Sequence, residues 1–348
     1  MNKIIIAISS IFILWIGRPI LIPFFVAVFF WYLINAIATY YRHALPYQNK
    51  NDCKHCTQYC FYNFISLFLS LITMGLLILL IATQIKPMFS EFMGILPELQ
   101  RKLSLFGEFL SESFGFKFDI NMIPNIPQIA KSVGSSVASL AASVGMILIY
   151  MLFLFIEQGT FENKLSHLFT DNAKSKKIRF ILSSIDNNMK KYLFMKTIIS
   201  LATGICGYIW LRAIGLEFAG VWAFLLFLLN YIPTIGSVVA CGLPILFALI
   251  SGNGLDMAIL TALGLIGLQI LWGNILDPKL TGKALNISTL AILVNLVFWG
   301  LIWGIAGMFF SVPILVALYV AAAQFDSTRW IAVLLSADGT IPEKTKIK

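Results

Sequence analysis

Charge is scarce in this chain of 348 residues. Asp, Glu, Lys and Arg together make up 12% of the sequence, and hydrophobic residues make up 59%, whereas about 25% of a soluble domain is charged. A soluble fold cannot bury so much apolar surface, so the low charge excludes a soluble globular protein. The sequence therefore predicts an all-α, polytopic membrane protein with about eight apolar helical segments.

Histidine is also rare, and His43, His55 and His167 all fall outside the apolar runs. No apolar run holds paired carboxylates, a His-Glu-x-x-His motif or a Gly-x-Ser-x-Gly motif. These absences argue against metallopeptidase and serine hydrolase chemistry, so we expect neither an enzyme nor a cofactor. The net charge of +9 is expected to reflect Lys and Arg on the cytoplasmic side of a membrane, and not nucleic-acid binding.

Five cysteines in this pattern do not form an extracellular disulfide framework. Cys53, Cys56 and Cys60 cluster in a polar loop, residues 42–60, whose positive bias places it in the cytoplasm. With His43 or His55 as a fourth ligand, these thiols have a spacing that a tetrahedral zinc ion could use. Free cytosolic thiols are the interpretation we favour, because a structural zinc finger usually has two such pairs.

The first parts of the chain differ in their charge. Residues 1–87 are expected to hold the N-terminal membrane helices, although the first apolar segment is shorter than the roughly 20 residues that a crossing needs. Residues 88–136 are less apolar and have no positive excess, so they are placed outside the cytoplasm. Their apolar residues recur in steps of three and four, typical of a helix that packs on the protein's own membrane surface or on another subunit.

Residues 137–193 are expected to form one crossing followed by a basic amphipathic helix. Between residues 158 and 193, seven Lys and Arg stand against three acidic residues. Apolar residues recur there at helical spacing, so this helix is predicted to lie on the anionic inner leaflet and to lead into the next crossing. A solvated basic face without a lipid role is the alternative.

Residues 194–323 are predicted to be a transport core with two interrupted apolar runs, 219–250 and 289–323. Proline removes a backbone hydrogen bond and glycine adds flexibility, so each run is expected to fold back as a hairpin. Residues 324–348 then form a cytoplasmic tail. The interrupting residues are Asn230, Pro233 and Gly236 in the first run, and Gly300, Gly304 and Gly307 in the second.

Two hairpins agree with the charge pattern. If both runs fold back, Lys279 and Lys283 between them lie on the cytoplasmic side. A crossing plus a hairpin from outside, followed by a crossing plus a hairpin from inside, is an inverted repeat of the kind found in secondary transporters. The segment Pro313–Leu318 also repeats five of the six residues of Pro244–Leu249. Simple packing kinks in two crossing helices are the alternative.

Polar side chains at membrane depth are few and mostly uncharged. They suit hydrogen bonding to a hydroxyl-rich solute better than proton relay, because a proton-coupled antiporter usually needs a carboxylate within the membrane. Packing between helices is their competing use. The predicted path residues are Asn230, Pro233, Gly236, Gln269, Asn274, Asp277 and Asn295.

Three stretches of the second half carry a family resemblance. They are Leu229-Asn-Tyr-Ile-Pro-Thr-Ile-Gly236, the loop Pro278-Lys-Leu-Thr-Gly-Lys283, and Phe298-Trp-Gly300 with Gly307 and Pro313 after it. In these stretches the chain resembles the autoinducer-2 exporter family of bacterial membrane proteins. The motif and hairpin residues are Pro278, Lys279, Gly282, Lys283, Gly300, Gly304, Gly307 and Pro313.

The resemblance implies an inner-membrane permease for small molecules that assembles as a homo-oligomer, with a pentamer as the candidate state. Export of a small polar solute, such as the signal in the family's name, ranks first. Sodium/proton antiport ranks second, and a non-transporting oligomeric scaffold ranks third. Besides the solute and further copies of the chain, the expected partners are membrane lipids, and nucleic acid is not one.

The paired-hairpin topology predicts that Lys283 faces the cytoplasm. A Lys283→Cys variant, made without the native cysteines, should resist a membrane-impermeant thiol reagent in intact cells and react after the cells are opened. Mass-shift labelling on a gel measures both reactions. Complete labelling in intact cells would rule out this topology.

Overall fold

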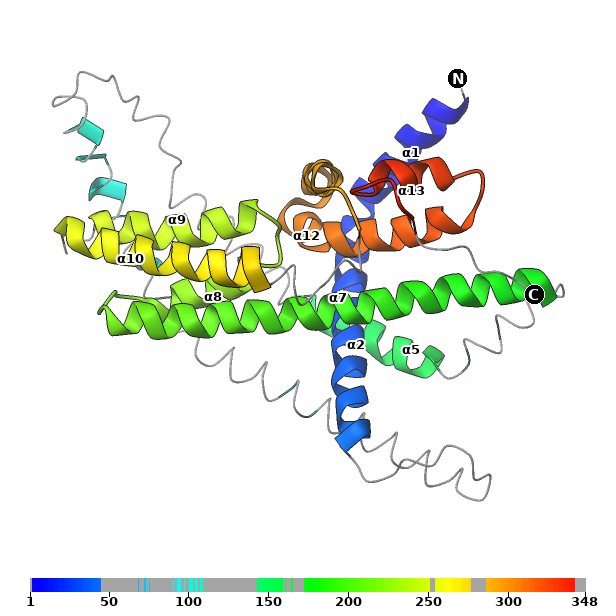
Figure 1. The fold of residues 1–348 in the computed structure, drawn as a ribbon, viewed down its shortest axis with the longest axis horizontal. Coiled ribbons are helices and arrows are strands. Elements are labelled where there is room, and N and C mark those ends of the chain that lie inside the picture. The colour runs from blue at the N-terminus through cyan, green and yellow to red at the C-terminus, as the bar shows by residue number, and fades with distance from the viewer. Residues whose placement is uncertain are drawn as a thin grey trace. The chain divides into compact units, whose positions relative to one another are not determined.

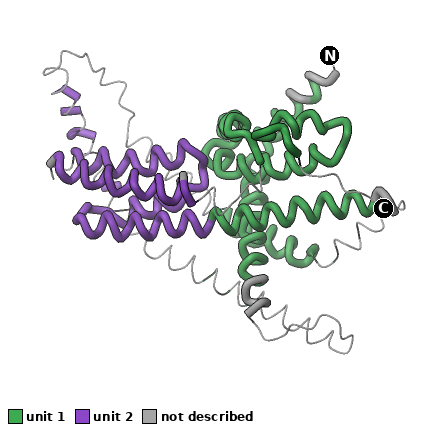
Figure 2. The backbone as a smooth tube through the Cα atoms, viewed as in Figure 1, with its two compact units in different colours: residues 1–77, 143–196, 281–348 green, residues 78–142, 197–280 purple. Residues whose placement is uncertain are grey.

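A computed structural model of the protein describes residues 2–44, 143–158, 172–250, 254–276 and 286–341, together with residues 160 and 164 and isolated residues between 68 and 108. The chain forms two compact units (Figure 2). Unit 1 comprises residues 1–77, 143–196 and 281–348, and unit 2 comprises residues 78–142 and 197–280. Each unit has a hydrophobic core of its own.

Helices account for all the regular elements of the described residues, apart from one isolated antiparallel bridge between Ile287 and Ser336. Four of these helices are long and apolar enough to cross a membrane. The predicted all-α, polytopic membrane fold is therefore confirmed. The four candidate spans are Arg18–Ala38, Ser175–Ala213, Leu255–Gly273 and Thr289–Gln324.

Figure 1 labels the helices of both units. The helix α7 (Asn172–Ala213) contributes its first part to unit 1 and its second part to unit 2. Unit 1 also contains α1 (Asn2–Ile16), α2 (Arg18–Ala44), α5 (Val144–Gln158), α12 (Thr289–Gln324) and α13 (Arg329–Leu335). Unit 2 also contains α8 (Ala219–Leu229), α9 (Ile235–Ile250), α10 (Gly254–Gln269) and the π-helical segment η3 (Ile270–Leu276).

Aromatic rings join α2 to α12 in unit 1. The ring centroid of Phe25 lies 5.1 Å from that of Trp303 and 5.9 Å from that of Phe310. The Trp303 indole N–H also donates to the carbonyl oxygen of Leu14 in α1, at 3.0 Å. The helix α1 has only 15 residues, too few for a perpendicular crossing, and this contact fastens it to the aromatic core.

The helix α7 is one continuous element of 42 residues, where the sequence predicted a surface helix that leads into a crossing, with a boundary between residues 193 and 194. Its first 32 residues, 172–203, contain neither proline nor glycine, so nothing in the backbone breaks it before the apolar part begins. The apolar stripe of the basic part is used within unit 1. Ile181, Met189, Tyr192 and Leu193 are buried there, so most of the stripe packs on protein, and contact of the basic face with the inner leaflet stays a prediction.

The helix α12 is broken at Gly304, where φ is 63° and ψ is −140°. A residue with a Cβ atom rarely adopts such angles, so the glycine permits the sharp turn between the two arms, residues 289–303 and 305–324. Across the break, the Asn295 side-chain amide donates to the carbonyl oxygen of Ser311 at 2.7 Å. Figure 1 shows the two arms running in different directions. Gly300 and Gly307 have ordinary helical φ angles and serve close packing near the break.

In unit 2 the second part of α7 packs on α8 and α10, and α9 packs on both α8 and α10 (Figures 1 and 2). A Cβ atom on Gly207 would approach the Leu226 side chain of α8 to 2.6 Å, and one on Gly204 would approach Phe227 to 3.0 Å. These two glycines let α7 and α8 approach closely, as small residues do between membrane helices. Likewise, Gly264 of α10 leaves room for the ring of Trp210, whose N–H donates to Leu260 at 3.2 Å.

Several predicted features lie outside the described residues. They include the cysteine cluster, most of the segment 88–136, and the motif loop between η3 and α12, so the zinc hypothesis and the loop topology stay predictions. The predicted tail contains a further helix, α13, which was not predicted from the sequence. The residues outside are Cys53, Cys56, Cys60, Asp277, Pro278, Lys279, Gly282 and Lys283.

The break in α12 should tolerate no side chain at Gly304. We expect Gly304→Ala to destabilise the protein by about 1–3 kcal/mol, because the backbone must hold a strained conformation or repack. Gly145→Ala in α5 is the matched control, since a Cβ atom there would meet nothing within 4 Å. Thermal unfolding in detergent compares both variants with wild type. Equal stability of Gly304→Ala and the control would contradict the strained turn.

Candidate transport site at the break between α8 and α9

The first interrupted run is broken between α8 and α9, at residues 230–234. Asn230 ends α8 with φ −61° and ψ −19°, and Thr234 then takes a positive φ of 60°. Pro233 has no N–H to offer and cannot continue the helix. Two short backbone bonds close the turn, from the N–H of Ile232 to Leu229 at 2.9 Å and from that of Ile235 to Pro233 at 2.6 Å.

Two neighbouring side chains of the break make polar contacts with α7. The Asn230 amide donates to the Ser200 hydroxyl at 3.1 Å, and the Tyr231 hydroxyl donates to the Thr197 hydroxyl at 2.8 Å. Asn230 and Tyr231 are buried, and Ser200 is completely inaccessible to solvent. Thr197, Ser200, Asn230 and Tyr231 form an uncharged group of polar side chains inside unit 2, which we call the polar quartet.

Thr197 and Ser200, the α7 half of the quartet, are not among the path residues predicted from the sequence. Thr197 and Ser200 are three residues apart, so they share one face of the helix, and both interrupt an otherwise apolar stretch. That spacing was a usable signal. Lys196, immediately before them, is also buried, although the charge pattern alone gave no reason to separate it from the basic residues earlier in α7.

Gly236 is required by the close approach of two backbones. A Cβ atom on Gly236 would overlap the carbonyl oxygen of Leu229, the last residue of α8, and would lie 2.9 Å from the Cβ atom of Ile232. Neither atom belongs to the flexible end of a side chain. Glycine therefore lets the first turn of α9 pack against the last turn of α8.

The other predicted path residues of unit 2 lie on α10 and η3. Gln269 ends α10 and is half-buried, and Asn274 belongs to the π-helical turn of η3. Within the described part of the chain, the hydrogen bond of Asn230 goes to Ser200 and not to Gln269. Trp272 of η3 has a buried indole nitrogen without a hydrogen-bond partner among the described residues. Single π-helical turns often occur at functional sites, and the roles of Gln269 and Asn274 in a path stay predictions.

The second break belongs to unit 1 and uses its asparagine differently. Asn295 bridges the two arms of its own helix, whereas Asn230 binds a neighbouring helix. Pro313, the counterpart of Pro244, is buried in the second arm. Both runs are thus broken in the structure, and the inverted repeat stays a prediction.

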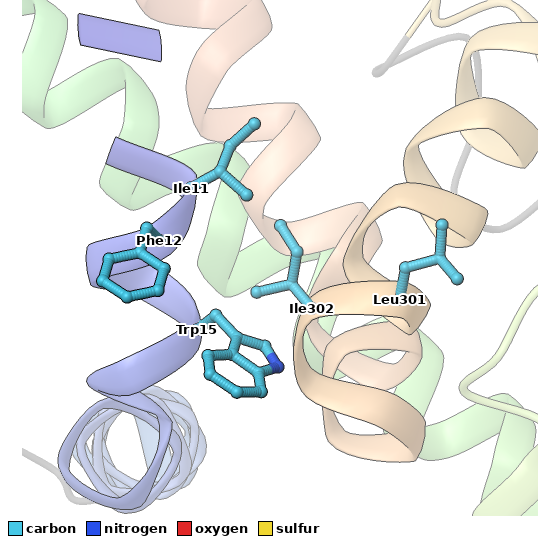
Figure 3. Close-up of a pocket in the computed structure, with 5 residues that line it drawn as sticks. All are labelled: Ile11, Phe12, Trp15, Leu301 and Ile302. Carbon is cyan, nitrogen blue, oxygen red and sulfur yellow. The ribbon is translucent and has the colours of Figure 1, made fainter. Parts of the chain in front are cut away.

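Unit 1 has a shallow cavity of about 370 Å³ between α1 and α12, lined by side chains that are hydrophobic (Figure 3). Leu301, on its rim, is 80% exposed. None of the predicted path residues lines this cavity, and its surface suits lipid chains better than a polar solute. The lining residues are Ile11, Phe12, Trp15, Leu301 and Ile302.

Comparison with known proteins matches residues 4–326 to a family model described as "AI-2E family transporter". "AI-2 transport protein TqsA" of Escherichia coli K12 is 36% identical over 195 residues, 56% of each chain. A protein of Haemophilus influenzae, named as a candidate transport protein, is 31% identical over 248 residues, 71% of this chain and 69% of its own. The "Sodium-lithium/proton antiporter" of Halobacillus andaensis is 24% identical over 256 residues, 69% of this chain and 71% of its own. The match to TqsA spans little more than half of that protein.

Filling the turn between α8 and α9 should damage the fold of unit 2. We expect Gly236→Ala to reduce the yield of assembled protein and to destabilise it by about 1–3 kcal/mol, because the added methyl group overlaps backbone. Gly242→Ala, six residues along the same helix, is the control, since a Cβ atom there would meet nothing within 4 Å. Size-exclusion profiles and unfolding in detergent measure both effects. Wild-type behaviour of Gly236→Ala would show that the turn is looser than described.

Proposed function

The chain belongs to the AI-2E family of transporters, and from that membership we propose that it exports a small polar solute across the bacterial inner membrane. Autoinducer-2 is the first candidate solute, because the name of TqsA, at 36% identity, assigns transport of AI-2 to that relative. We further propose a homo-oligomer, with five subunits as the candidate number, and cytoplasmic positions for both termini. The positive bias of the loop 42–60 and of the tail supports this orientation.

The polar quartet is the observation that carries the proposal. Asn230, Ser200, Tyr231 and Thr197 present amide and hydroxyl groups, which can donate or accept a hydrogen bond without carrying charge. A hydroxyl-rich solute loses water when it enters such a site, and each unpaired polar group left behind costs about 1–3 kcal/mol. The hydroxyls of the solute can replace the hydrogen bonds within the quartet. The solute then regains the hydrogen bonds that it lost with its water. An uncharged diol fits this chemistry better than an ion does.

The break itself supplies a way for the quartet to open. Residues 230–234 lie between two helices and hold only short-range backbone bonds, so α8 and α9 can tilt relative to each other with few bonds to exchange. Broken helices of this kind form the binding sites of many secondary transporters. In the proposed mechanism, the break at residues 230–234 moves away from α7, admits the solute between Asn230 and Ser200, and closes again after the solute leaves.

Sodium/proton antiport is the second candidate, favoured by the 24% identity to the Halobacillus antiporter. The lack of buried acidic side chains among the described residues argues against antiport. Across the described residues no Asp or Glu is buried, and a proton carrier within a membrane is usually a buried carboxylate. Glu157 is exposed and paired with Lys164, and Glu217 is also exposed. A non-transporting scaffold ranks third.

Flux measurements on purified protein in liposomes test the proposal. We expect autoinducer-2 to move down its gradient through wild-type protein, and Asn230→Leu to lower the flux by about tenfold or more, because the solute loses a hydrogen-bond partner at the break. Ser200→Ala is the matched comparison. It removes one hydroxyl of the quartet but keeps the Asn230 amide, so flux should fall by less than in Asn230→Leu while assembly stays at the wild-type level.

The two variants separate a path residue from a packing residue. If Asn230 only packs on α7, both substitutions break the same contact and should lower flux and assembly together. Equal flux in Asn230→Leu, Ser200→Ala and wild type would place the path elsewhere. Proton or sodium movement without flux of autoinducer-2 would favour the antiporter.

A further inference from the structure

The short helix α13 has apolar side chains on both of its sides. On the inner side Ala332 is completely buried, and Ile331 and Leu335 are half-buried against unit 1. On the outer side Trp330 is 65% exposed and Leu334 is 72% exposed. A helix that merely covered the end of α12 would need only one apolar side, so the outer side requires a second partner.

This outer face is held firmly in place. The N–H of Ser288 donates to Leu335 at 2.8 Å, and the N–H of Ala337 donates to Asn286 at 3.0 Å. At the other end of α13, the Thr328 hydroxyl donates to the carbonyl oxygen of Ala322 at 3.1 Å. Because both ends of a seven-residue helix are fastened, α13 cannot rotate to bury Trp330 and Leu334 within unit 1.

Polar segments on both sides fix the depth of α13 relative to a membrane. Before it, the apolar run of α12 ends at Gln324, and Asp326 is exposed. After it, Asp338 is exposed and accepts hydrogen bonds from the Thr340 hydroxyl at 2.7 Å and the Asn286 amide at 2.6 Å. These bonds lower the pKa of Asp338 to about 2, so it is charged at every physiological pH. Charged groups of this kind stay out of the hydrocarbon core.

The dimensions and chemistry of α13 point to the boundary between lipid and water. Seven residues extend over only about 10 Å, far too little to cross a bilayer. Tryptophan is the residue most typical of this boundary, where the ring lies among headgroups. The exposed Arg329 beside it can reach lipid phosphates. A second basic group lies nearby, since the Lys177 ammonium is 4.8 Å from the ring of Phe325, four residues before Arg329.

We propose that α13 is an interfacial anchor, whose face of Arg329, Trp330, Val333 and Leu334 enters the phospholipid headgroup layer. A second copy of the chain is the competing occupant. The face is one side of a seven-residue helix, whereas a stable protein interface needs roughly 800 Å² from each partner. Lipid requires no such area, because each exposed apolar side chain gains by itself from entering the interface.

Quenching of a fluorescent thiol probe tests the anchor in the full-length protein. The probe is placed at Leu334→Cys, or at Ala337→Cys as the control, in a variant without the native cysteines, and the protein is reconstituted in phosphatidylcholine vesicles. We expect lipids brominated on the acyl chains to quench the probe at 334 about threefold more strongly than the probe at 337. Aqueous iodide should show the opposite order. Both positions are exposed, so the substitutions leave the core of unit 1 untouched.

Two outcomes would overturn the proposal. Strong iodide quenching at 334 would place the outer face in water, and protection of 334 from both quenchers would show that a second copy covers it. A Trp330→Ser variant gives an independent reading. If α13 is anchored, this substitution should increase the iodide quenching of the probe at 334. Unchanged quenching would show that Trp330 has no part in holding the helix. Because the measurement needs no transported solute, its failure is distinguishable from a failure of the proposed function.

Discussion

Every backbone N–H and C=O group within a membrane must find a partner inside the protein, because the hydrocarbon offers none. A straight helix meets this condition by itself, so each break in a helix has to be compensated. The two broken runs do so in different ways. Between α8 and α9, short backbone bonds close the turn and Asn230 fastens it to Ser200. In α12, the Asn295 amide reaches across the break and donates to the carbonyl oxygen of Ser311, which ties the two arms together. The positions of glycine follow from the same constraint, since Gly236 and Gly307 allow backbone to approach backbone where the chain turns.

The sequence predicted the class of fold and the location of both breaks, because proline, glycine and the loss of charge act locally. It could not say which glycine turns α12. Gly300, Gly304 and Gly307 were equal candidates, and the choice depends on φ at Gly304 and on what surrounds the other two. Nor did it predict that α7 continues unbroken from its basic part into its apolar part. The change in composition suggested a boundary, but a helix ends only where the backbone is interrupted, and α7 has no such residue there.

The candidate site could be predicted only in part, for a related reason. Asn230 and Gly236 stand out because they interrupt an apolar run. Ser200 and Thr197 are small polar residues that many membrane helices carry, and they gain meaning only when α7 is seen beside the break. The result is a site with amide and hydroxyl groups and no buried carboxylate among the described residues. Such groups suit the binding of a neutral solute better than the transfer of a proton. Family membership alone does not distinguish these two functions.

The length of α7 has a mechanical consequence. A helix of 42 residues is about 63 Å long, whereas a bilayer with its headgroups is about 40–45 Å thick. Ser200 and Thr197 lie well along this rod, and about 40 Å of helix separates Ser200 from the first residue, Asn172. A straight helix of this length is longer than the bilayer is thick. If it lies along the membrane normal, at least one of its ends extends past the headgroups into water, and it fits inside the bilayer only when strongly tilted.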